Sequence, residues 1–90
     1  MDKLALQSLA SDLKRITLSI QRNSLNSASR FNKEARIWLK QSLEKSNDSS
    51  VRKILEKVSI VLDQKDDIKK AEDCLMYSVL LQNRSLKDEY

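Results

Sequence analysis

The 90-residue sequence contains no glycine and no proline. Without glycine, turns that require a positive φ angle must use asparagine or aspartate, and tight β-hairpins are difficult to form. Without proline, no residue in the chain is incompatible with the interior of a helix. Leucine, lysine, glutamine, glutamate and alanine, which favour helices, are all well represented. We therefore predict an all-α fold whose helices are joined by short polar connectors.

Histidine is also absent, and Cys74 is the only cysteine. A serine nucleophile would lack its usual base, a helical di-iron site would lack its Glu-x-x-His motif, and no glycine-rich loop can wrap a phosphate. One cysteine forms neither an intrachain disulfide nor a thiolate cluster, and inside an apolar run it is predicted to be a small buried hydrophobe. We expect no enzymatic activity, no metal, no cofactor and no small-molecule substrate.

Long apolar runs are missing from the N-terminal segment. Charged residues interrupt it at Asp2, Lys3, Asp12, Lys14 and Arg15. No stretch there is long enough for a signal peptide or a membrane span. A single cysteine is in keeping with a reducing compartment. The sequence therefore predicts a cytoplasmic protein that does not enter a membrane.

Apolar residues recur at spacings of three and four in four segments, which predicts helices over about 3–22, 27–46, 50–63 and 67–86. The polar clusters between them supply capping residues. The predicted buried stripes are Leu6, Leu9, Leu13, Ile16 and Ile20; Ala28, Phe31, Ala35, Trp38, Leu39 and Leu43; Val51, Ile54, Leu55, Val58, Val61 and Leu62; and Ile68, Ala71, Leu75, Val79 and Leu86.

Connectors of only a few residues join helices that lie antiparallel and adjacent. The predicted architecture is an up-down-up-down antiparallel four-helix bundle, with Trp38 as a core residue. The alternative is three helices, in which the first two predicted segments fuse into one long rod that needs a dimer partner to cover it.

The run CLMYSVLL, residues 74–81, is too apolar for one helix to bury entirely. With Leu75 at the centre of the buried face, steps of 100° per residue place Tyr77 almost directly outward, with Leu80 on the same side. Met76, Tyr77 and Leu80 are contiguous and are predicted to form a partner-binding patch. The predicted function is a non-enzymatic protein-interaction or regulatory module, whose partner is another protein or a second copy.

Charge is uneven along the chain, whose net charge is +4. Residues 1–45 carry nine basic and four acidic side chains, whereas residues 46–90 carry eight and nine. Arg30, Lys33 and Lys40 share the helix face opposite Trp38, with Arg22 near in sequence. These residues give an alternative, a nucleic-acid-binding accessory protein that uses this basic face. It is the less favoured hypothesis because no aromatic side chain alternates with the basic ones.

Overall fold

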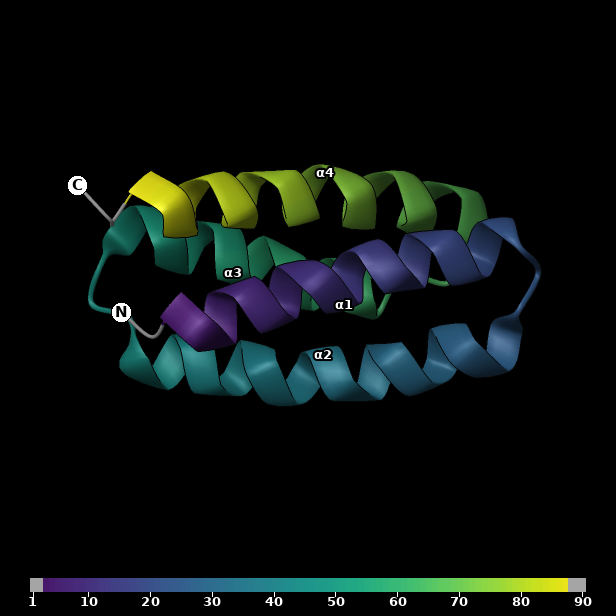
Figure 1. The fold of residues 1–90 in the computed structure, drawn as a ribbon, viewed down its shortest axis with the longest axis horizontal. Helices are drawn as coiled ribbons and strands as arrows, with labels where there is room; N and C mark the ends of the chain where they lie inside the picture. The colour runs from purple at the N-terminus through teal and green to yellow at the C-terminus, as the bar shows by residue number, and fades with distance from the viewer. Residues whose placement is uncertain (1–2, 88–90) are drawn as a thin grey trace.

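The computed structural model describes residues 3–87, which form four helices: α1 (Lys3–Gln21), α2 (Leu25–Lys45), α3 (Ser49–Leu62) and α4 (Asp67–Lys87). Each helix runs antiparallel to the one before it, with α2 and α4 on either side of α1 and α3 behind (Figure 1). The described chain measures 38 × 21 × 18 Å. The predicted all-α four-helix bundle is confirmed.

The connection between α1 and α2 decides against the three-helix alternative. Asn23 adopts a left-handed conformation with a φ angle of 57°, which asparagine tolerates better than most residues. The backbone N–H of Ser24 then donates to the carbonyl of Ser19 at 2.8 Å and closes the end of α1. The turn is so tight that α2 begins at Leu25, two residues before its predicted start.

Aspartate side chains begin the two later helices. Asp48 precedes α3, and its Oδ1 accepts the backbone N–H of Ser50 at 2.8 Å and that of Val51 at 3.4 Å. Asp66 precedes α4 and accepts the backbone N–H of Ile68 at 3.1 Å. These N-caps satisfy N–H groups that have no partner within the helix. They also hold the pKa of Asp48 below its ordinary value, through bonds donated first by Ser50 and then by Val51.

The core is built around α1, which packs against both α2 and α4. Three of the four predicted stripes point inward, although Trp38 and Phe31 are only partly buried where they pack against the core. The fully or nearly fully buried members are Leu6, Leu9, Leu13 and Ile16 of α1, Ala35 and Leu39 of α2, and Val51, Leu55, Val58, Val61 and Leu62 of α3.

The predicted orientation of α4 is wrong. Of its predicted buried stripe only Ala71 is buried, and Ile68, Leu75, Val79 and Leu86 are exposed. The buried side of α4 consists instead of Ala71, Cys74, Ser78, Leu81 and Ser85.

Small side chains explain this orientation of α4. The hydroxyl of Thr17 on α1 donates to the backbone carbonyl of Ala71 at 2.8 Å, so the two helices lie close together at this level. A large side chain at the position of Ala71, Ser78 or Ser85 would hold the helices apart. Burial of the side that carries these small residues brings α4 close to α1 and leaves Ile68, Leu75, Val79 and Leu86 outside.

Candidate protein interaction surface

Six large hydrophobic side chains of α4 face solvent. Ile68, Leu75, Val79 and Leu86 follow one line along the helix, which we call the outer stripe. Met76 lies beside this stripe, and Leu80 lies further round the helix. All six are between 42% and 75% exposed. The other exposed large hydrophobics in residues 3–87 are Leu4, Leu18, Leu25, Ile37 and Ile60, distributed over three helices. Only α4 therefore carries an extended apolar surface among the described helices.

The outer stripe has the spacing of a coiled-coil seam. Positions 68, 72, 75, 79, 82 and 86 alternate steps of four and three, and Glu72 and Gln82 are its two polar members. At roughly 1.5 Å per residue the line from Ile68 to Leu86 is about 27 Å long. Such a row is suited to contact with another helix.

A shallow hollow adjoins one end of the outer stripe. Its volume is about 320 Å³, and it lies between α1 and α4. The residues around it are Gln7, Ala10, Ser11, Gln82 and Leu86. We call it the Leu86 hollow. It offers space for one side chain of a docked helix.

The three residues predicted to bind a partner do not form one exposed patch. Met76 and Leu80 are exposed, as predicted. Tyr77 is partly buried and packs against the core, so the prediction that it points outward is wrong. The rotation of α4 that buries Leu81 instead of Leu75 also turns Tyr77 inward.

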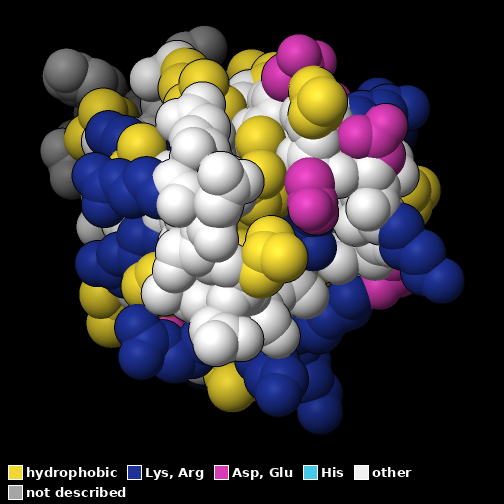
Figure 2. All heavy atoms as spheres, turned by 90° about the vertical axis from the view of Figure 1, so that its right-hand side faces the viewer, with side chains coloured by type: hydrophobic (Ala, Val, Ile, Leu, Met, Phe, Trp, Pro, Cys, Tyr) yellow, Lys and Arg dark blue, Asp and Glu magenta, His cyan; other side chains and the backbone are white. Residues whose placement is uncertain are grey.

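The basic residues of the alternative hypothesis are exposed but dispersed. Arg30 lies over the ring of Phe31, 5.2 Å from its centroid, and Arg15 of α1 approaches the same ring at 5.6 Å. Lys40 lines a surface hollow together with Ile37 and Glu44. At the end of the bundle that carries the α1–α2 turn, lysine and arginine side chains stand around the rim, with hydrophobic, uncharged and, on one side, acidic groups between them (Figure 2). Arg22 is exposed in that turn.

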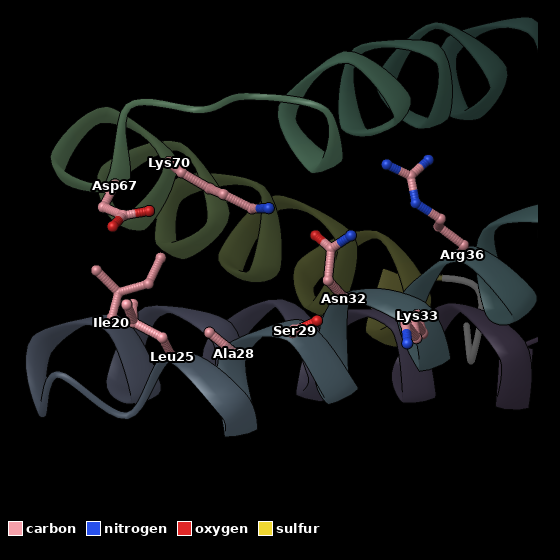
Figure 3. Close-up of a pocket in the computed structure, with 9 residues that line it drawn as sticks. All are labelled: Ile20, Leu25, Ala28, Ser29, Asn32, Lys33, Arg36, Asp67 and Lys70. Atoms are coloured by element: carbon pink, nitrogen blue, oxygen red, sulfur yellow. The ribbon is translucent and has the colours of Figure 1, made fainter.

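Lys33 contributes to a different hollow, of about 400 Å³, between α2 and the start of α4. Arg36 and Lys70 approach the same space, with the side chain of Asn32 between them (Figure 3). Arg36 is paired with the carboxylate of Asp63, and Lys70 Nζ donates to the carbonyl of Leu62 at 3.1 Å. Burial lowers the pKa of Lys70. Arg36 and Lys70 therefore link α2 and α4 to the end of α3. These contacts leave the two side chains less available to bind an anion.

One ionisable side chain is buried between helices. Asp12 of α1 is 1% exposed, and Arg15 Nη1 donates to its Oδ1 at 3.1 Å. Its Oδ2 has no hydrogen-bond partner among residues 3–87. Burial first, and then the nearby carboxylate of Glu34, raise the pKa of Asp12 to about 6, although Arg15 opposes this. These surroundings favour the neutral, protonated form of the Asp12 carboxyl group over its charged form.

The lone thiol is not in a reactive environment. Cys74 is fully buried on the side of α4 that faces the core, as predicted. Burial raises the pKa of the Cys74 thiol to about 11. Because the thiolate is the nucleophilic form, the thiol is unreactive near neutral pH. Cys74 therefore has a packing role.

Residues 3–87 show neither a metal centre nor a membrane span. No group of three or more histidine, cysteine or acidic side chains is placed to hold a metal ion there. No helix in this part of the chain combines the length and apolarity needed to cross a membrane. Comparison with protein-family models, curated proteins and solved structures found no match.

The sequence prediction assigned the outer stripe to the core because its apolar residues recur at helical spacing. A second pattern in the same segment indicates the true packing face. Ala71, Ser78 and Ser85 recur at intervals of seven, in line with Leu81 and Cys74. A row of small residues at helical spacing is typical of helices that pack closely. This row of small residues is the sequence feature from which the buried side of α4 could have been predicted.

Proposed function

We propose that this chain is a non-enzymatic protein-interaction module that binds a protein partner through the outer stripe of α4, with Met76 beside it. One observation carries the proposal: six large hydrophobic side chains on a single helix are at least 42% exposed. Monomeric proteins rarely expose extended apolar patches, and those that do commonly use them for binding.

The chemistry of the stripe favours a helical partner. Its seven-residue spacing presents a straight apolar row in which Glu72 and Gln82 are the polar positions. A partner helix would dock along the row and remove its side chains from water.

The cytoplasm is the proposed location. An unpaired thiol is in keeping with a reducing compartment, and Cys74 is the only cysteine in the sequence. Nucleic-acid binding receives less support than protein binding. Arg30 packs on Phe31, Lys33 lies in a different hollow, and Ile37 separates Lys33 from Lys40 along the helix.

Replacement of Leu75 and Val79 by lysine is expected to abolish partner binding. Both side chains lie in the middle of the outer stripe, where charge would have to be buried on docking. Tagged wild-type and variant chains would be used to capture partners in the native host, with quantitation by mass spectrometry. The partner is expected to fall by at least about tenfold with the variant, and purified partner is then titrated against both chains.

The matched control replaces Ile37 and Ile60 by lysine. These are also strongly exposed isoleucines, but they lie on α2 and α3. The control is expected to capture the partner as the wild type does. Capture of one partner in equal amounts by the wild type and the α4 variant, or loss of that partner with the control alone, would contradict the proposal.

A further inference from the structure

We infer that the occupant of the outer stripe is a second copy of this chain, docked antiparallel with the two-fold axis level with Tyr77. The inference rests on the proposed function of that stripe and names its partner. It is carried by the way the two ends of the stripe complement each other.

The stripe is self-complementary when it is reversed. Residues equidistant from position 77 come opposite each other, so Ile68 of one copy meets Leu86 of the other, and Leu75 meets Val79. The two polar positions also meet, because Glu72 comes opposite Gln82. The amide of Gln82 is able to donate a hydrogen bond to the carboxylate of Glu72. No like charges are opposed along the row.

The two ends of the outer stripe are also complementary in shape. Ile68 is 75% exposed, which makes it the most prominent large hydrophobic of residues 3–87. The Leu86 hollow lies at the other end of the stripe. Antiparallel pairing brings Ile68 of each copy to the Leu86 hollow of the other, so that both hollows are filled by one symmetric contact.

A parallel pair lacks these features. Every residue would then meet its own counterpart, which opposes Glu72 with Glu72 and leaves both hollows without Ile68. Like charges opposed across a helix pair are destabilising. The antiparallel arrangement is therefore the one that the surface fits.

The contact is small, so the dimer is weak. One helix face of about 27 Å by about 10 Å is below the size of a standard interface. We expect a dissociation constant on the order of 100 µM, with dilute protein monomeric.

Sedimentation equilibrium from about 10 µM to about 1 mM tests the dimer. The wild type is expected to pass from monomer to dimer over this range. Ile68→Lys is expected to remain monomeric, whereas Ile60→Lys, at a similarly exposed isoleucine on α3, is expected to dimerise as the wild type does. Circular dichroism verifies that each variant is folded.

A second variant distinguishes insertion of Ile68 into the Leu86 hollow from non-specific association through exposed apolar surface. Ser11→Phe fills the Leu86 hollow and adds apolar surface at the same place. If Ile68 inserts there, Ser11→Phe weakens the dimer by about tenfold or more. A stronger dimer with this variant would overturn the docking geometry.

Charge changes at position 82 test the direction of the helices. Gln82→Lys is expected to tighten the dimer by about 2- to 10-fold, because each lysine faces Glu72 of the other copy, and Gln82→Glu to weaken it similarly. In a parallel pair both variants oppose like charges, so weakening by both would overturn the antiparallel arrangement.

A wild type that is monomeric at about 1 mM would overturn the dimer itself, because even a weak symmetric contact is populated there. The proposed function would survive that result if a foreign partner is still lost with the lysine substitutions at Leu75 and Val79. It would fail separately if those substitutions leave capture unchanged.

Discussion

Replacement of Leu81 by alanine is expected to lower the free energy of unfolding by about 2–5 kcal/mol. Leu81 is fully buried on the side of α4 that packs into the core, so truncation leaves a cavity there. The loss is a large fraction of the roughly 5–15 kcal/mol by which domains are stable. Urea unfolding of dilute protein, followed by circular dichroism, measures it.

Leu75→Ala is the matched control, with the same chemical change on the same helix. Its side chain is 44% exposed, so its loss is expected to cost under about 1 kcal/mol. The opposite order, with a large cost at Leu75 and a small one at Leu81, would restore the orientation of α4 that the sequence predicted.

Asp12→Asn is expected to stabilise the protein at pH 8 by about 1–3 kcal/mol, with a gain about half as large at pH 5. The pKa of Asp12 rises from 3.8 to about 6 on folding, so the folded state holds a proton more tightly than the unfolded state does. The stability contributed by this proton is fully present below pH 3.8 and is lost as the pH rises through about 6. Asparagine keeps an oxygen for Arg15 and never acquires the buried charge.

Urea unfolding at pH 5 and pH 8 measures this linkage. The absence of histidine leaves the interval free of other side chains with ordinary pKa values inside it. Wild-type stability is expected to be higher at pH 5 than at pH 8, and Asp12→Asn to remove most of the difference. Glu34→Gln is expected to reduce the difference only partly, because burial is the larger cause of the raised pKa. Equal wild-type stability at the two pH values would contradict the assignment.

The fold was predictable because composition and spacing agree in three of the helices. Leu6, Leu9, Leu13 and Ile16 form a single apolar stripe on α1 with polar residues around it, and all four are fully buried. Asparagine takes the positive-φ turn position expected of it at Asn23, and Asp48, one of the expected N-caps, begins α3. Each of these features depends on local sequence alone.

The orientation of α4 was not predictable in the same way because this helix is apolar on two sides. The side with the larger residues, including Leu75 and Val79, gives the stronger hydrophobic signal. Which side is buried depends on α1, where Thr17 allows the backbone at Ala71 to approach. Pairwise fit between two helices is a tertiary property that periodicity does not contain.

The candidate surface was predictable in part for the same reason. An excess of apolar residues in 74–81 correctly indicated that some would be exposed, and Met76 and Leu80 are. Tyr77 was misplaced by the error in rotation, and the outer stripe was assigned to the core. The basic residues were placed on one helix face, but their neighbours Phe31 and Arg36 became known only from the fold.

Methyl NMR with a soluble paramagnetic agent tests most directly that α4 presents its larger apolar side to solvent. In protein at about 10 µM, well below the expected dissociation constant, the methyl groups of Ile68, Leu75, Val79 and Leu86 should be strongly broadened, and those of Leu81 protected. Protection of the outer stripe should then appear as the protein concentration rises. Protection of Leu75 and Val79 in the dilute monomer, together with broadening of Leu81, would show that the outer stripe is core and not a binding surface.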